Sequence, residues 1–270
     1  MSPTVLMLFA TGIPILCYIP YLTKNKLWGT LLGKKLALHL AGVGFCSSAF
    51  PFLCVMIALN YTTPANASIL NQTEVLYSLL LTYIFLGEKP TIKQLIGTAM
   101  ILTGVVFILL GANKFTMQLK GDLLVIGTSW IFQVGHILAK KLPPDLPEHF
   151  ITAARAFYAF IFTIPLTFIL TFFGIQPFIT VSWQTVVCVL FMGTAFYIFG
   201  NYFWYIAIRN MDLSKATTLM MSYPVFTYII STVFGYDKIT ILKTLGIIFA
   251  LGGAYLVNSV IKKQRKGAIK

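Results

Sequence analysis

Charged residues are scarce in this chain, and acidic residues are the scarcest. Asp and Glu together number 7 among 270 residues, and all charged residues make up only 10% of the sequence. Soluble globular domains contain about 25% charged residues. A chain that is so poor in charge and 58% hydrophobic is excluded from the ordinary soluble enzymes, and its composition indicates an integral membrane protein.

Cysteine pairs and the sequence motifs of enzymes are also missing. The four cysteines lie in apolar runs without a C-x-x-C spacing, so the sequence predicts neither a disulfide framework nor a metal site. It contains no P-loop, no H-E-x-x-H and no G-x-S-x-G. We therefore expect no enzyme activity and no cofactor.

Long apolar runs fill most of the chain. A helix that crosses a bilayer needs about 20 apolar residues, and nine segments meet this length: 4–22, 36–59, 66–86, 93–112, 120–140, 150–173, 183–208, 214–235 and 241–261. The runs are continuous and not alternating, which argues against a β-barrel. The predicted fold class is an all-α integral membrane protein, a nine-helix bundle.

Basic residues are unevenly divided between the two sides that nine spans define. One side, with the C-terminal tail 262–270, holds 15 Lys and Arg, the other side holds 4, and Arg155 lies inside a span. Because Lys and Arg concentrate in cytoplasmic loops, we expect a multi-pass protein of the cell membrane with a basic, cytoplasmic tail. This explains the net charge of +13 without a nucleic-acid partner.

The chain resembles itself at an offset of 149 residues. The polar turn 88–92 aligns without a gap with 237–241, and two glycines after each turn align as well, Gly97 and Gly104 with Gly246 and Gly253. Matching spans are five apart, which is an odd number, so the two copies run in opposite directions through the membrane. Inverted repeats of this kind are typical of secondary transporters.

The two copies are unequal in length. The first repeat covers 1–112 with four helices and the second covers 120–261 with five, because helix 120–140 has no partner. A complete pattern would be five plus five helices. We therefore expect the chain to lack one helix before Met1, which would also return the N-terminus to the cytoplasm.

These features resemble the EamA-type permeases of the drug/metabolite transporter superfamily. The resemblance lies in the segments 58–68 and 85–91, in the glycine-containing helix that follows, and in the turn 237–240 of the second copy. It implies an inverted five-plus-five fold that here lacks its first helix, and the transport of small metabolites. The chain departs from the family at Tyr236-Asp237, where Gly-Glu is frequent.

One acidic residue lies well inside a predicted span. Glu74 shares a helical face with Asn71 and Ser78 at i, i+3 and i+7, and the repeat places Tyr223, beside Pro224, at the matching position. A charge at such depth costs a few kcal/mol, about 3 on insertion scales. We interpret Glu74 as a proton or cation site or a ligand for a substrate amine; the alternative is a protonated acid that links two helices.

Polar residues also follow one face of helix 120–140. Ser129, Gln133, His136 and Lys140 are spaced by 4, 3 and 4 residues. Such a stripe lines a water-filled path, along which His136 would titrate near neutral pH. The alternative is that Lys140 snorkels to the interface and His136 bonds a neighbouring helix.

Segment 183–208 presents a third candidate face. Tyr197 and Asn201 lie on it with Trp204 or Tyr205, and they would stack on a flat or aliphatic substrate. The alternative, which the high aromatic content favours, is that these rings belong to the aromatic belts at the membrane interfaces.

Arg155 allows two interpretations. It lies five residues past Phe150, near the cytoplasmic end of its span. It would either hold an anionic group of a substrate or snorkel to the interface, and the sequence favours snorkelling.

The turn after the third span is expected to be scaffold. Gly87 can end a helix with a positive φ, and Thr91-x-x-Gln94 has the form of a capping box. The residues to which we assign a structural role are Glu88, Gly97, Gly104, Pro224, Asp237, Gly246 and Gly253.

The sequence therefore favours a secondary transporter that moves a small organic metabolite by alternating access. Its pathway residues would be Asn71, Glu74, Ser78, Gln133, His136, Tyr197, Asn201 and Tyr223. Proton coupling through Glu74 and facilitated exchange both remain open, and the alternative is a non-transporting membrane scaffold. The expected partners are a small-molecule substrate and the lipid bilayer, with a homodimer as a further candidate.

Overall fold

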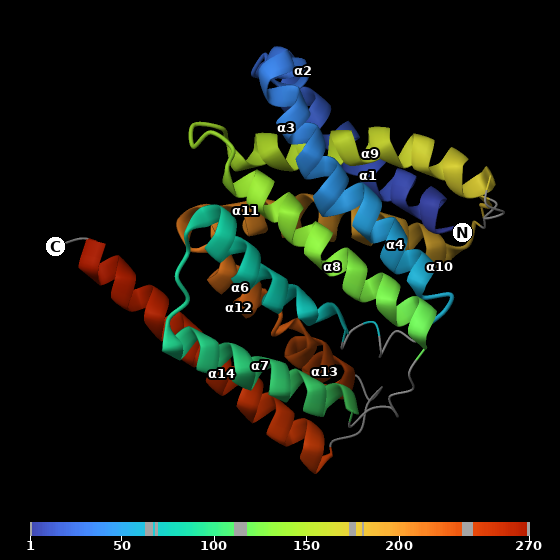
Figure 1. Ribbon diagram of the computed structural model, residues 1–270. Helices are drawn as coiled ribbons and strands as arrows, with labels where there is room; N and C mark the ends of the chain where they lie inside the picture. The colour runs from blue at the N-terminus through green and yellow to red at the C-terminus, as the bar shows by residue number, and fades with distance from the viewer. Residues whose placement is uncertain are drawn as a thin grey trace. The chain divides into compact units, whose positions relative to one another are not determined.

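The computed structural model is built from helices (Figure 1). It describes the residues 2–62, 67, 70–110, 118–172, 177–179, 181–233 and 240–268, and this part of the chain contains no strand. Two compact units divide the chain: unit 1 comprises 1–57 and 131–210, and unit 2 comprises 58–130 and 211–270.

The helices have the length and the surface of membrane spans. Among the described residues, six are long and apolar enough to cross a bilayer: Thr4–Lys24, Leu36–Ala58, Leu119–Lys140, Glu148–Phe172, Trp183–Asn210 and Ile241–Ser259. Many large apolar side chains point outward, as Leu38 does with 82% of its surface exposed and Phe172 with 96%. Apolar surface of this extent requires lipid around it, so the chain is a multi-pass membrane protein and an all-helical bundle.

Unit 1 combines helices from both ends of its sequence range. They are α1 (Pro3–Lys24), α2 (Trp28–Leu32), α3 (Lys34–Gly44), η1 (Phe45–Ala49), α4 (Phe50–Ala58), the second half of α8 (Leu119–Lys140), α9 (Glu148–Phe172), α10 (Trp183–Phe191), η2 (Met192–Gly200) and α11 (Asn201–Asn210). Helix α1 packs along α9. A core cluster joins Met7, Ala49, Ala159 and Tyr197.

Unit 2 is organised around one long helix pair. Its elements are α6 (Thr73–Leu86), α7 (Ile92–Leu110), the first half of α8, α12 (Leu213–Met220), α13 (Tyr223–Val233) and α14 (Ile241–Ala268). Helices α7 and α14 lie side by side (Figure 1). Their glycines, described next, allow the two backbones to approach closely.

The contacts between α7 and α14 are reciprocal. A Cβ on Gly97 would lie 2.8 Å from the carbonyl oxygen of Gly253, and a Cβ on Gly253 would meet the carbonyl of Gly97. Gly104 and Gly246 face each other in the same way, so the two helices run antiparallel. Since the four glycines are related by the 149-residue offset, these are the contacts that a two-fold relation inside the unit would produce.

Unit 1 contains a comparable pair of contacts. A Cβ on Gly44 of α3 would lie 2.6 Å from Cβ of Tyr158 on α9, and a Cβ on Gly193 of η2 would lie 2.8 Å from Cβ of Ile13 on α1. Gly44 and Gly193 are again 149 residues apart. Helix α9, against which Gly44 packs, corresponds in the repeat to α1, against which Gly193 packs. The two contacts are therefore equivalent under the repeat.

Two predicted spans are broken helices, which corrects the expectation of continuous ones. Span 214–235 is divided into α12 and α13 by a turn at Met221 and Ser222, and Gln72 forms a turn directly before α6. The breaks are 149 residues apart. Pro224 lacks an N–H for the helical ladder, but the apolar composition that predicts a span does not show where that ladder is interrupted.

The turn after α6 agrees in part with the predicted caps. Gly87 ends α6 with φ +68°, which confirms the left-handed C-cap. Thr91 Oγ1 accepts from the backbone N–H of Gln94 at 3.2 Å, as one half of a capping box does. The expected return contact, from the Gln94 side chain to the backbone of Thr91, was wrong, because the Gln94 side chain donates to Ser214 Oγ at 3.2 Å instead.

Candidate functional site

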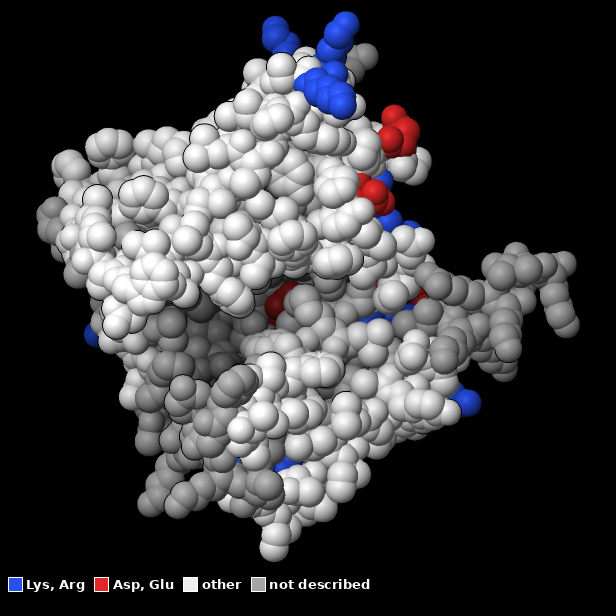
Figure 2. Space-filling view, turned by 180° about the vertical axis from the view of Figure 1, so that it is seen from behind, with Lys and Arg blue, Asp and Glu red and all other residues white. Residues whose placement is uncertain are grey.

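On the face that Figure 2 shows, the charged side chains of the described residues cover only small areas. In the space-filling view, Lys and Arg of unit 1 gather at the end where α2 lies (Figure 2), and the exposed lysines there include Lys24, Lys26 and Lys34. A second class of charged groups is buried, namely Glu74, Asp122, Lys215 and Lys243 in unit 2 and Arg155 in unit 1. Among them, Glu74 and Arg155 lie at least five residues from the ends of their predicted spans, and these two positions define the candidate sites, one in each unit.

In unit 2, the break in the third span places Glu74 at a helix start. Glu74 is the second residue of α6, directly after the turn at Gln72, and only 3% of its surface is exposed. The N–H groups of a first helical turn lack partners within the helix and carry a partial positive charge, which favours a carboxylate. The local backbone thus explains how an acidic residue is accommodated inside an apolar span.

The residues predicted beside Glu74 differ in their surroundings. Ser78, one turn further on the same face, is fully buried, and its hydroxyl has no hydrogen-bond partner among the described residues. Asn71 is half-buried and precedes the break. Tyr223 begins α13 and is 40% exposed, whereas Pro224 after it is buried. Burial therefore groups Ser78 with Glu74 but leaves Tyr223 nearer the surface.

Glu88 follows the C-terminal end of α6 and contacts the start of α12. One carboxylate oxygen of Glu88 accepts from the backbone N–H of Leu213 at 2.8 Å, and the other accepts from the N–H and the hydroxyl of Ser214 at 3.0 and 2.8 Å. The side chain therefore caps the first turn of α12, where a negative charge is favoured. Asp237, which aligns with Glu88, lies outside the described residues.

In unit 1, Arg155 is the centre of a buried polar cluster. It is 4% exposed, and its Nε donates to Ser48 Oγ at 2.6 Å and its Nη1 to Asn201 Oδ1 at 2.7 Å. Its Nη2 donates to the backbone carbonyl of Ser47. The favoured interpretation of Arg155 as a snorkelling side chain was therefore wrong, because three inward acceptors hold the guanidinium inside the unit.

These acceptors lie in or directly after two π-helical segments. Ser47 and Ser48 belong to η1, and Asn201 follows η2 directly. The two segments correspond under the 149-residue offset, and the wider π turn is frequent at functional sites. Gly135 of α8 lets its helix approach η1, since a Cβ there would lie 2.5 Å from Ser47 N. The sequence singled out Arg155 and Asn201 separately, but it missed Ser47 and Ser48 and the contacts that join the four residues. The one signal for the serines was a Ser-Ser pair within an apolar run.

Aromatic and imidazole groups surround the guanidinium. Tyr205 is 1% exposed, it lies beside Arg155 and Ser47, and its hydroxyl has no hydrogen-bond partner of good geometry among the described residues. Trp204 Nε1 donates to Nδ1 of His136 at 3.1 Å, so His136 bonds the neighbouring helix α11. This arrangement adds a donor, the Tyr205 hydroxyl, beside the buried cation.

The remaining predicted pathway residues are buried in packing. The Tyr197 hydroxyl donates to Sδ of Met7 at 3.0 Å within the core cluster of unit 1. Gln133 is fully buried, and Ser129 Oγ donates to the Val125 carbonyl at 3.1 Å. The polar stripe of α8 therefore faces protein, and Lys140 at its end donates to the carbonyl of Ile208.

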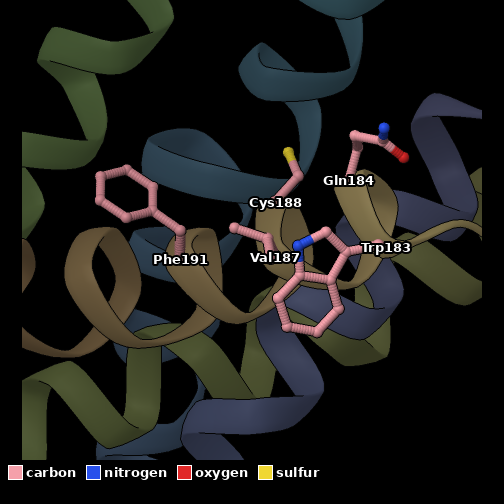
Figure 3. A pocket seen from close by; sticks show the side chains of 5 residues that line it. All are labelled: Trp183, Gln184, Val187, Cys188 and Phe191. Carbon is pink, nitrogen blue, oxygen red and sulfur yellow. The ribbon is translucent and has the colours of Figure 1, made fainter.

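A groove outside these clusters belongs to a single helix. Five residues of α10 line it, Trp183, Gln184, Val187, Cys188 and Phe191 (Figure 3). The lining is almost entirely apolar and open, as expected for a helix face in contact with acyl chains. The described residues also contain no group of three His, Cys, Asp or Glu side chains that would hold a metal.

Comparison with known proteins gives a family and a fold. The EamA-like transporter family matches residues 2–110 and again residues 119–259. The chain is 26% identical to an uncharacterized transporter of Archaeoglobus fulgidus over 228 residues, which are 82% of this chain and 76% of that protein. It is 23% identical to a probable amino-acid metabolite efflux pump of Salmonella typhimurium over 226 residues, 80% of this chain and 75% of the pump.

A protein of known crystal structure has a similar fold. Its TM-score is 0.79 at 17% identity, and the match covers 97% of this chain and 89% of that chain. At this level of identity the match concerns the fold alone. The names of the sequence relatives describe transporters and not enzymes.

Proposed function

The chain belongs to the EamA-like transporter family, and from this premise we propose that it is a secondary transporter that moves a small organic metabolite by alternating access. One observation carries the proposal. Glu74, a buried carboxylate inside an apolar span, occupies the first turn of a helix that begins at a break. Transporters commonly use the ends of discontinuous helices to hold substrates and coupling ions.

The repeat architecture supports the same mechanism. We propose that 1–112 and 120–261 are inverted repeats, because the glycine contacts, the helix breaks and the π-helical segments all recur at one offset of 149 residues. Two structurally similar repeats of opposite direction have two related conformations, which open to opposite sides of the membrane. The pathway would use the polar clusters of Glu74 and of Arg155.

The orientation and partners follow from charge and surface. We propose that the protein lies in the cell membrane with the tail 262–270 in the cytoplasm, which the division of 15 basic residues against 4 supports. Its partners would be the small-molecule substrate and the surrounding lipid. A homodimer stays a prediction.

Amino acids and their derivatives are the first substrates to test. The relative from Salmonella typhimurium carries the name of an amino-acid metabolite efflux pump, and Glu74 supplies a negative group that would bind an amine. A thermal-shift screen of the purified chain would select compounds, since a ligand that binds the folded state raises its stability.

The decisive experiment uses proteoliposomes and Glu74→Gln. We expect the wild type to exchange a stabilising compound in counterflow and to accumulate it against a pH gradient. Glu74→Gln keeps the shape but cannot carry the charge, so it should retain counterflow and lose accumulation. Glu148→Gln is the matched control, because Glu148 is a partly exposed partner of Arg209 at 3.6 Å.

The other outcomes separate the remaining alternatives. Accumulation that is unchanged in Glu74→Gln would remove Glu74 from the coupling mechanism, and counterflow without any gradient dependence would indicate facilitated exchange. If no stabilising compound shows flux through the wild type, the chain is a membrane scaffold and the proposal is wrong.

A further inference from the structure

We propose that Arg155 and Tyr205 form an anion subsite in unit 1, which binds the carboxylate of the transported molecule. The inference rests on the proposed function, because it assigns a substrate class to the transporter. It goes beyond that function by naming the group of the substrate that is recognised and the two side chains that recognise it.

Counting donors shows that the subsite has unused capacity. A guanidinium carries five N–H groups, and three of those of Arg155 are used by Ser48, Asn201 and the carbonyl of Ser47. Two N–H groups form no hydrogen bond with a described residue beyond their close contact with the Tyr205 hydroxyl. This hydroxyl is 1% exposed, lies against Arg155 and Ser47, and forms no well-aligned hydrogen bond among the described residues. Donors of Arg155 and Tyr205 thus adjoin each other in a buried place.

The charge of Arg155 is likewise not compensated by the described residues. Its three acceptors are a hydroxyl, an amide oxygen and a backbone carbonyl, which are all neutral. A buried cation without a counter-charge is costly. The neutral acceptors fix the plane of the guanidinium while leaving its charge available, so an incoming anion would gain both the hydrogen bonds and the charge.

The number and type of donors favour a carboxylate. A carboxylate has one negative charge and two oxygens that match two parallel N–H groups of an arginine, and the Tyr205 hydroxyl would supply a third bond. A dianionic phosphate ester would bring a second charge that a single guanidinium does not balance. A cationic or neutral group would leave the charge of Arg155 uncompensated.

The surroundings allow such a closed subsite to open. Arg155 and Tyr205 are both almost completely buried, so a ligand enters only if neighbouring helices move. The acceptors of Arg155 belong to η1 or adjoin η2, and π-helical turns are frequent at functional sites. Movement of these segments away from α9, which carries Arg155, would expose the guanidinium.

The test compares acids with their amides on the purified full-length chain. The probes are L-alanine, L-leucine and L-phenylalanine, each beside its carboxamide, with sodium chloride at matched ionic strength as the inorganic anion. Apparent affinities come from thermal-shift titrations. We expect each stabilising acid to bind more tightly than its amide, since the amide offers no charge to Arg155.

Conservative variants show whether the selectivity depends on this cluster. Tyr205→Phe removes only the hydroxyl and should weaken acid binding about tenfold, the usual worth of one hydrogen bond to a charged group, with amide binding unchanged. Tyr202→Phe, on the same helix with its ring stacked 4.1 Å from His149, is the matched control and should change neither. Arg155→Lys keeps the charge but loses the fork and should reduce the preference for the acid.

The outcomes separate this inference from the transport mechanism. Equal binding of acid and amide, wild-type acid binding by Tyr205→Phe, stabilisation by chloride alone, or no stabilisation by any acid would each overturn the subsite. Acid-selective binding without counterflow would overturn the transporter and keep the subsite. Counterflow of a compound that does not depend on its carboxylate would overturn the subsite and keep the transporter.

Discussion

At the residue scale, the buried cation of unit 1 depends on each of its neutral acceptors. Asn201→Ala removes the oxygen that accepts from Arg155 Nη1 at 2.7 Å and leaves a charged donor buried without a partner. We expect a loss of about 1–3 kcal/mol in the free energy of unfolding. Asn210→Ala is the control, because Asn210 is exposed at the end of the same helix and its side chain bonds the Ile206 carbonyl.

Denaturation of both variants in one detergent gives the measurement. Asn210→Ala should change the free energy of unfolding by less than about 0.5 kcal/mol. Equal stability of the two variants would mean that the contact between Arg155 and Asn201 contributes nothing.

A second single-residue prediction concerns the cap on α12. Glu88 accepts three hydrogen bonds from Leu213 and Ser214, and its negative charge interacts with the start of the helix. Glu88→Gln keeps the size but loses the charge, so it should cost about 1–2 kcal/mol of stability. Glu148→Gln should cost less than about 1 kcal/mol, because partly exposed ion pairs contribute little. Parallel melting curves would decide, and an equal cost for both would refute the cap.

The candidate site residues differ in how well the sequence predicted their surroundings. Glu74 was found because an acid in an apolar run is conspicuous, and Gly87 because a positive φ suits glycine. Arg155 was misassigned, because the local sequence around a basic residue near a helix end does not distinguish a side chain that points to the interface from one that points inward. The choice depends on Ser48 and Asn201, which are 107 and 46 residues away.

At the element scale, the pair α7 and α14 depends on the absence of side chains at its crossings. Gly97→Ala would place a Cβ 2.7 Å from Cγ2 of Val257 and 2.8 Å from the Gly253 carbonyl. The helices would have to separate, at a cost of about 1–3 kcal/mol. Gly127→Ala on α8 is the control, since nothing lies within 4 Å of its added Cβ, and alanine there should be neutral or stabilising by up to about 1 kcal/mol.

The reciprocal geometry sharpens this prediction. Gly104→Ala and Gly246→Ala each direct a methyl group at the backbone of the other helix, so their costs should agree within about 0.5 kcal/mol. Thermal unfolding of the set tests it, and a clear difference between the two would contradict the two-fold relation between the helices.

Helix ends and helix interiors differ in how well the sequence predicts them. Each predicted span contains a helix in the described residues, because length and apolar composition are enough to define one. The breaks at Gln72 and at Met221 and the segments η1 and η2 were not predicted. The backbone hydrogen bonds at the two turns are local, such as those from Val75 N to Gln72 O at 3.1 Å and from Ser222 N to Leu219 O at 3.2 Å. The apolar composition that predicts a span does not distinguish such a turn from a continuous helix.

At the scale of the whole molecule, sequence repeats and compact units do not coincide. Unit 1 takes α1 and α3 from the first half of the sequence and α9 to α11 from the second, and unit 2 takes α7 from the first and α14 from the second. Each unit therefore pairs helices that correspond to each other. A half of the sequence expressed alone would lose these pairings, so neither unit can be formed by one repeat.

The distribution of basic residues along the whole chain predicts its orientation in the membrane. The tail 262–270 and the segments on its predicted side hold 15 Lys and Arg against 4 on the other side, and because Lys and Arg concentrate on the cytoplasmic side of membrane proteins we propose that the basic side faces the cytoplasm. A green fluorescent protein fused after Lys270 should fluoresce, whereas alkaline phosphatase at the same place should be inactive because it folds only outside the cytoplasm. Fusions within residues 111–117, which the count of spans predicts on the opposite side, are the control and should show the reverse. An active phosphatase at the C-terminus would invert the orientation, and with it the side to which Lys24, Lys26 and Lys34 belong.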